Sequence, residues 1–130
     1  MFEKNKVFCL ACKSKTLGSY AIKAGAKVYV GFDAVPFSLN GNMIGKRAFR
    51  QIKFELRSAV YDSLLSAIEN NYSFNQLSRY LKLRINKKRI DLMLNKEKKG
   101  KERRIKIARI LGSIKNGITL FGDGEIRVND

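Results

Sequence analysis

The sequence predicts an α/β fold, in which a small, mostly parallel sheet carries a basic helical insertion and is completed by a C-terminal β-hairpin. Three observations predict it. An apolar run, a helical pattern and a second apolar run follow one another within residues 7–32. Apolar side chains then recur every three or four positions through much of residues 44–116, as in amphipathic helices. Finally, an Asp-Gly pair separates the short runs 118–121 and 125–128, which is a strong hairpin signal.

The N-terminal part predicts a strand, a helix and a second strand. The first strand is expected over residues 6–11, whose continuous apolar run is typical of a strand buried on both faces. Ser14 or Thr16 can cap the following helix, and Gly25 fits the left-handed position that ends it. Residues 27–32 are rich in β-branched and aromatic side chains and predict the second strand.

The middle of the chain predicts helices. The longest is expected over residues 46–69, where apolar side chains keep a three-to-four spacing. Two short helices are expected at 74–81 and near 90–94, followed by a charged turn over 96–101. A last helix should end near Gly117.

The length of 130 residues fits one domain with a hydrophobic core. We therefore predict a single domain over residues 1–130. Within it, residues 1–43 and 117–130 would form the α/β part, and residues 44–116 the basic helical insertion.

Positive charge is concentrated in that insertion. The chain has 27 Lys and Arg against 11 Asp and Glu, a formal charge of +16. Residues 44–116 hold 20 of these basic residues and 6 of the acids, a net +14. Such a surface favours an anionic partner such as nucleic acid. The alternative is that these residues only decorate solvated helix faces. No membrane partner is predicted, because no wide apolar face opposes the basic residues.

The densest part of the insertion gives the candidate nucleic-acid-binding residues. Residues 82–109 hold 13 basic residues and 3 acids. We expect phosphate contacts from its clustered cations, which are Lys87, Lys88, Arg89, Lys98, Lys99, Lys101, Arg103 and Arg104. The region also loosely resembles a helix-turn-helix, with a first helix over 74–81, a recognition helix over 86–94 and a basic wing-like turn over 96–104.

The chain contains no histidine, which excludes a self-contained Cys-His or Ser-His-Asp centre. Its two cysteines cannot close a structural zinc site by themselves, so neither a metal nor another cofactor is predicted. The spacing Cys9-x-x-Cys12 and the lack of a signal peptide or membrane span indicate a reducing, cytoplasmic setting.

Cys12 is the candidate nucleophile. It follows the first expected strand, and a helix N-terminus, Lys13 and Lys15 nearby would favour its thiolate. The alternative is an ordinary small thiol at a strand end, since free cysteines are commonly buried. A redox role with Cys9 is disfavoured, because residues three apart on a strand point to opposite faces.

The segment from Val7 to Phe32 resembles the nucleophile segment of caspase-like cysteine peptidases, especially the bacterial CHAT-type branch and its gingipain-like relatives. The matching residues are Ala11-Cys12, Leu17-Gly18, Ala24-Gly25-Ala26-Lys27 and Val30-Gly31-Phe32. The chain end is similar to the family's last strands through Leu120-Phe121-Gly122-Asp123 and Ile126-Arg127-Val128.

The resemblance implies that Cys12 attacks a peptide bond and forms a thioester, with a histidine as the proton shuttle. The family carries that histidine on an earlier strand, whereas this chain has none. The resemblance therefore implies a C-terminal fragment or subunit that is inactive alone, a partner protein that supplies the missing N-terminal half, or a fold kept without its activity. The alternatives are a small nucleic-acid-binding protein, and an interaction module that pairs the edge of its sheet with a partner strand.

Overall fold

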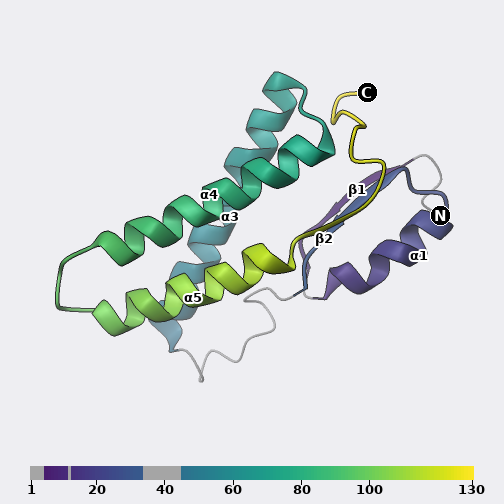
Figure 1. The fold of residues 1–130 in the computed structure, drawn as a ribbon. Helices are drawn as coiled ribbons and strands as arrows, with labels where there is room; N and C mark the ends of the chain where they lie inside the picture. Colours follow the sequence, from purple (N-terminus) through teal and green to yellow (C-terminus); the bar gives the residue numbers. More distant parts are fainter. Residues whose placement is uncertain (1–4, 12, 34–44) are drawn as a thin grey trace.

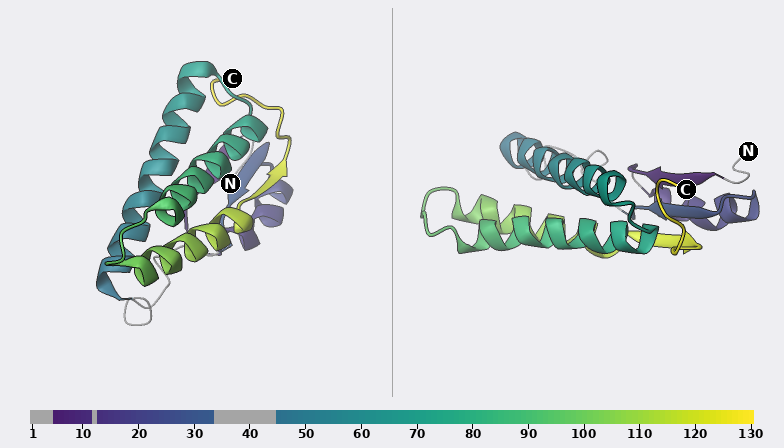
Figure 2. Two further views of the ribbon diagram at one scale, coloured as in Figure 1. Left: turned by 60° about the vertical axis from the view of Figure 1, so that its left-hand side comes forward. Right: turned by 90° about the horizontal axis from the view of Figure 1, so that it is seen from above.

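The computed structural model describes residues 5–11, 13–33 and 45–130. It confirms the predicted α/β class; the described residues are mostly helical, and their sheet has three strands. The three long helices lie together at one end and the sheet with its short helix at the other (Figure 1 and Figure 2). The elements in chain order are β1 (Lys6–Cys9), the 3-10 helix η1 (Ser14–Leu17), α1 (Gly18–Lys23), β2 (Val28–Gly31), α3 (Lys46–Asn70), α4 (Phe74–Leu94), α5 (Lys101–Gly117) and β3 (Thr119–Gly122).

The sheet has the order β1-β2-β3 and is mixed rather than mostly parallel. Strand β1 runs parallel to β2, with Lys6 opposite Val28 and Cys9 opposite Gly31. Strand β3 runs antiparallel to β2 on its other side. All four residues of β2 are buried, whereas those of β1 are only half-buried. The expectation that the first strand is buried on both faces was therefore wrong, because β1 lies at an edge of this sheet.

Alternate side chains of β2 enter two separate cores, as the two-residue period of a strand requires. Val28 and Val30, with the following Phe32, belong to a core that also includes buried residues of all three long helices. Tyr29 points to the other face and packs against Ala21 of α1. The sheet is thus a thin layer between α1 and the long helices.

Helix α3 confirms the predicted 46–69 helix and ends one residue later. Helix α4, in contrast, replaces the two expected short helices with one continuous helix. Leu77, Leu81 and Ile85 are fully buried along one face of it, so its packing continues without a break. The predicted helix-turn-helix was therefore wrong, because its expected turn lies inside an unbroken helix.

The prediction of a C-terminal β-hairpin was also wrong. After β3 the chain crosses to the start of α4 instead of turning back onto β3. The amides of Phe74 and Asn75 donate to the carbonyl oxygens of Ile126 and Gly124, each at 2.9 Å. The first turn of a helix leaves its amides without intrahelical acceptors, and the C-terminal segment supplies two of them.

Candidate nucleic-acid interface

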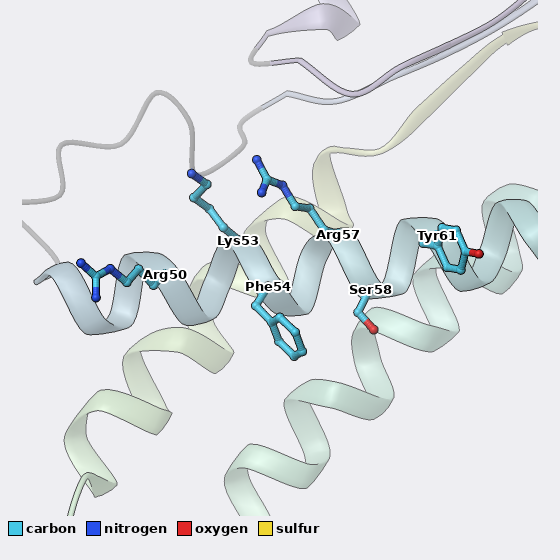
Figure 3. A pocket seen from close by; sticks show the side chains of 6 residues that line it. All are labelled: Arg50, Lys53, Phe54, Arg57, Ser58 and Tyr61. Carbon is cyan, nitrogen blue, oxygen red and sulfur yellow. The ribbon is translucent and has the colours of Figure 1, made fainter.

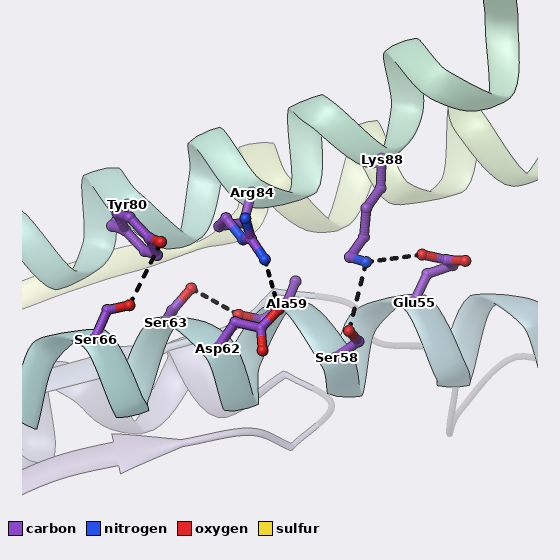
Figure 4. Close-up of polar contacts among 9 residues, drawn as sticks. All are labelled: Glu55, Ser58, Ala59, Asp62, Ser63, Ser66, Tyr80, Arg84 and Lys88. Atoms are coloured by element: carbon purple, nitrogen blue, oxygen red, sulfur yellow. Dashed lines mark hydrogen bonds and ion pairs between the residues drawn. The ribbon is translucent and has the colours of Figure 1, made fainter.

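Three of the eight predicted basic residues form contacts within the protein, two of them between helices and one with the connection between α4 and α5. Lys88 Nζ lies 3.0 Å from Glu55 Oε2 and joins α4 to α3 (Figure 4). Arg89 Nε donates a 2.9 Å hydrogen bond to the carbonyl oxygen of Ala108 and joins α4 to α5. These side chains hold the helices together and face other helices rather than an external ligand.

Arg104 is the third of these residues. Its side chain is buried at the N-terminal end of α5, where the guanidinium donates to the carbonyl oxygens of Lys99, Asn95 and Glu97. Arg104 thereby holds the segment that connects α4 to α5 against the first turn of α5. The other five predicted residues are exposed, and these are Lys87, Lys98, Lys99, Lys101 and Arg103.

Two acidic side chains of α3 form ion pairs with basic side chains of α4. Asp62 Oδ2 accepts a 2.6 Å hydrogen bond from Arg84 Nη2, and this bond raises the pKa of Arg84 (Figure 4). Glu55 pairs with Lys88 in the same interface. Two of the six acids within residues 44–116 are thus directed between helices, which leaves the outer surface of α3 more basic.

The outer surface of α3 carries a stripe of arginine and aromatic side chains. Arg47, Arg50, Phe54, Arg57 and Tyr61 follow one another at intervals of three or four residues and so lie on one face of the helix. That face is opposite to the buried one. Phe54 is 70% exposed and Tyr61 is 66% exposed. Figure 3 shows Arg50, Phe54, Arg57 and Tyr61 along this side of α3.

All residues of the stripe except Arg47 line an open hollow of about 480 Å³, which also includes Lys53 and Ser58. Two adjoining hollows extend the surface to α5 through shared arginines. Arg47, Arg50 and Phe54 line one of them together with Arg103 of α5. The other lies between the first turn of α3 and α5 and includes Lys106 and Glu102.

These hollows form one surface that we call the basic face. Its cations are Lys46, Arg47, Arg50, Lys53, Arg57, Arg103 and Lys106. Glu102 is the only acid among the described residues that line the three hollows. Lys53 Nζ lies over the Phe49 ring, 5.3 Å from its centre, so this cation also contacts an aromatic side chain. The basic face therefore combines seven cations with the exposed rings of Phe54 and Tyr61.

Sequence reasoning missed all of the basic face except Arg103. The cations of α3 come singly or in one adjacent pair, so they form no dense run. The signal that could have found these cations is their spacing along the predicted helix. They recur every three to four residues, opposite the apolar positions that predict the helix.

Cys12, the predicted nucleophile, lies outside the described residues. The chain on either side of it is tied to the end of β2. Ser14 Oγ accepts a 2.9 Å hydrogen bond from the Phe32 amide and donates one of 2.8 Å to the carbonyl oxygen of Cys9. Neither Ser14 nor Thr16 acts as the expected side-chain cap, because Ser14 bridges the strands and Thr16 donates to the Lys13 carbonyl oxygen.

Cys9 is a free, half-buried cysteine beside Tyr29. Tyr29 donates a 2.7 Å hydrogen bond from its hydroxyl to the carbonyl oxygen of Ser14. Burial, followed by the nearby Cys9 thiol, raises the pKa of Tyr29 to about 12. The hydrogen bonds of Ser14 and Tyr29 therefore hold together the ends of β1 and β2.

Within the ranges that the structure describes, no three His, Cys, Asp or Glu side chains form a group that could hold a metal ion. No helix in the same ranges combines the length and the apolar content needed to cross a membrane. Comparisons with models of protein families, with curated proteins and with solved structures found no match to this chain.

Proposed function

We propose that this protein binds nucleic acid through the basic face. The observation that carries the proposal is the gathering of seven Lys and Arg side chains from α3 and α5 on one surface, where the described residues include a single acid. Binding to a phosphate backbone displaces its condensed counterions, and each neutralised phosphate adds to the affinity. Four of the seven cations are arginines, whose planar guanidinium can bind phosphate with two parallel hydrogen bonds.

The shape of the basic face supports an extended polyanion rather than a single phosphate. Arg47 and Arg57 are ten positions apart on one helix, with Arg50 between them, which corresponds to about 15 Å at the usual rise per residue. A row of this length can follow several consecutive phosphates of one strand. An anionic membrane is less well matched, because interfacial helices place a broad apolar face beside their cations.

The proposal is tested by the salt dependence of oligonucleotide binding. Fluorescence anisotropy of a labelled mixed-sequence 20-mer should report binding at 50 mM salt. With about five phosphate contacts, the affinity should fall on the order of 100-fold between 50 and 200 mM salt. The absence of binding to DNA and RNA oligonucleotides at 50 mM salt would overturn the proposal.

We also propose, as a second and independent function, that the segment around Cys12 derives from a caspase-like peptidase. The observation that favours it is the parallel pairing of β1 with β2, with α1 between them in the chain. This succession agrees with the strand, helix and strand implied by the resemblance. Because the chain has no histidine, a partner protein would have to supply the base, or the activity has been lost.

A further inference from the structure

We infer that the nucleic acid bound by the basic face is single-stranded, and that its bases stack on Phe54 and Tyr61. The inference rests on the proposed function and specifies its ligand. Both rings are largely exposed, although burial of apolar surface is favourable. Both also line the same hollow as Arg50 and Arg57.

The order of side chains along α3 combines the two kinds of contact that a single strand needs. Arg50, Phe54, Arg57 and Tyr61 alternate between a cation and an aromatic ring. Proteins that bind single strands combine a positively charged track for the backbone with aromatic rings for the bases. In a duplex the flat faces of the bases are covered by their neighbours, so exposed rings could contribute little to its binding.

The spacing of the rings fits such a strand. Phe54 and Tyr61 are seven residues apart, which is about 10.5 Å along the helix. Phosphates of one strand are about 3.4 Å apart along a stacked helix and further apart when the strand is extended, so this distance corresponds to at most about three nucleotides. Two bases of one strand could therefore occupy the two rings while Arg47, Arg50 and Arg103, which line the adjoining hollow with Phe54, contact the backbone.

The site ends at Tyr61. The sequence has no Lys or Arg between Arg57 and Arg79, so the exposed Leu65 and Ile68 further along α3 lie beyond the charged part. Charge complementarity thus assigns the segment from Arg47 to Tyr61 to a polyanion. An acidic protein segment would satisfy the charge but would not need two exposed rings that alternate with arginines along the helix.

The test compares three ligands with the intact chain and with two variants. The ligands are a labelled single-stranded 20-mer, the duplex of the same sequence, and polyphosphate, which has charge but no bases. The first variant is Phe54→Ala/Tyr61→Ala. The control is Tyr20→Ala, which removes a similarly exposed ring (70%) from α1, outside the basic face.

We expect the double variant to bind the single strand at least about 25-fold more weakly, since stacking contributes roughly 5- to 150-fold per base. Polyphosphate binding should stay within twofold, Tyr20→Ala should match the unaltered protein, and the duplex should bind more weakly than the single strand. Unfolding curves of both variants should match that of the unaltered protein, because all three side chains are exposed.

Several results would overturn the inference. Unchanged single-strand binding by the double variant would do so while leaving the proposed function intact, and so would a duplex that binds as tightly as the single strand. An equal loss of polyphosphate binding would mean that the rings act only through the shape of the surface. A polyglutamate peptide that competes as well as the oligonucleotide would point to a protein ligand. If the unaltered protein binds neither nucleic acid nor polyphosphate, the proposed function itself fails.

Discussion

Arg89 on α4 and Gly112 on α5 form a close contact between the two helices. A Cβ atom at Gly112 would lie 2.9 Å from Cζ of Arg89, so the guanidinium covers the place where a larger residue would have its side chain. The same guanidinium donates to the carbonyl oxygen of Ala108 and to Oδ1 of Asn86. Arg89 is therefore part of the helix packing.

Replacing Arg89 by Ala should lower the free energy of unfolding by about 1–3 kcal/mol, because it removes charge-assisted hydrogen bonds and the cover over Gly112. Lys87→Ala is the matched control, since Lys87 is exposed and lies on the same helix. Its effect should stay within about 0.5 kcal/mol. Urea unfolding followed by circular dichroism measures both variants. Equal effects would show that Arg89 does not join the helices.

The raised pKa of Tyr29 predicts a loss of stability in alkaline solution. Below pH 10 the hydroxyl is protonated in both the folded and the unfolded chain, so it adds no pH dependence. Between pH 10 and about 12 the unfolded chain loses this proton while the folded protein keeps it. The free energy of unfolding should therefore fall as the pH rises, by about 2–3 kcal/mol over this window from Tyr29 alone.

Tyr29→Phe isolates this contribution. The variant lacks the titrating hydroxyl, so its stability should fall less steeply above pH 10, although lysines titrate in both proteins. It should also be about 1 kcal/mol less stable at neutral pH, because the hydrogen bond to the Ser14 carbonyl oxygen is lost. Unfolding curves at pH 8, 10 and 11.5 make the comparison. Parallel stability profiles for the two proteins would contradict the assigned cause.

The caspase-like proposal predicts unequal reactivity of the two cysteines. Cys12 should react with a thiol probe at neutral pH much faster than Cys9, because Lys13 and Lys15 near it favour its thiolate. Cys9 is half-buried and packs with Tyr29 in the smaller core between the sheet and α1. Labelling of the Cys9→Ser and Cys12→Ser variants assigns each rate. Slow and equal labelling of both would count against an activated Cys12.

Helix α3 was predictable because its buried residues repeat with the helical period over 25 residues. The break expected near Lys82 was not found, since Lys and Leu both favour helices and Leu81 and Ile85 continue the buried face. The Asp123-Gly124 pair predicted a hairpin from neighbouring residues alone. It was overridden by the amides at the start of α4, which take acceptors from the C-terminal segment.

The dense run of basic residues on α4 did not indicate the candidate site, for a geometric reason. Consecutive residues of a helix point about 100° apart, so Lys87, Lys88 and Arg89 cannot share one face. Lys88 and Arg89 are directed to neighbouring helices, and of the three only Lys87 is exposed. On α3 the wider spacing places Arg47 and Arg50 together on the outer surface. The hollows shared with α5 depend on tertiary packing, which a linear sequence does not reveal.

The central claim is tested most directly by two triple variants that remove the same charge from different places. Arg47→Ala/Arg50→Ala/Lys106→Ala alters the basic face, whereas Lys87→Ala/Lys98→Ala/Lys99→Ala alters exposed lysines elsewhere on α4 and in the turn that follows it. The measurement is single-strand affinity as a function of salt. The first variant should bind at least 10-fold more weakly than the second, with a salt slope smaller by about 2–3 than that of the unaltered protein. Equal losses, or a larger loss in the second variant, would contradict the assignment of binding to the basic face.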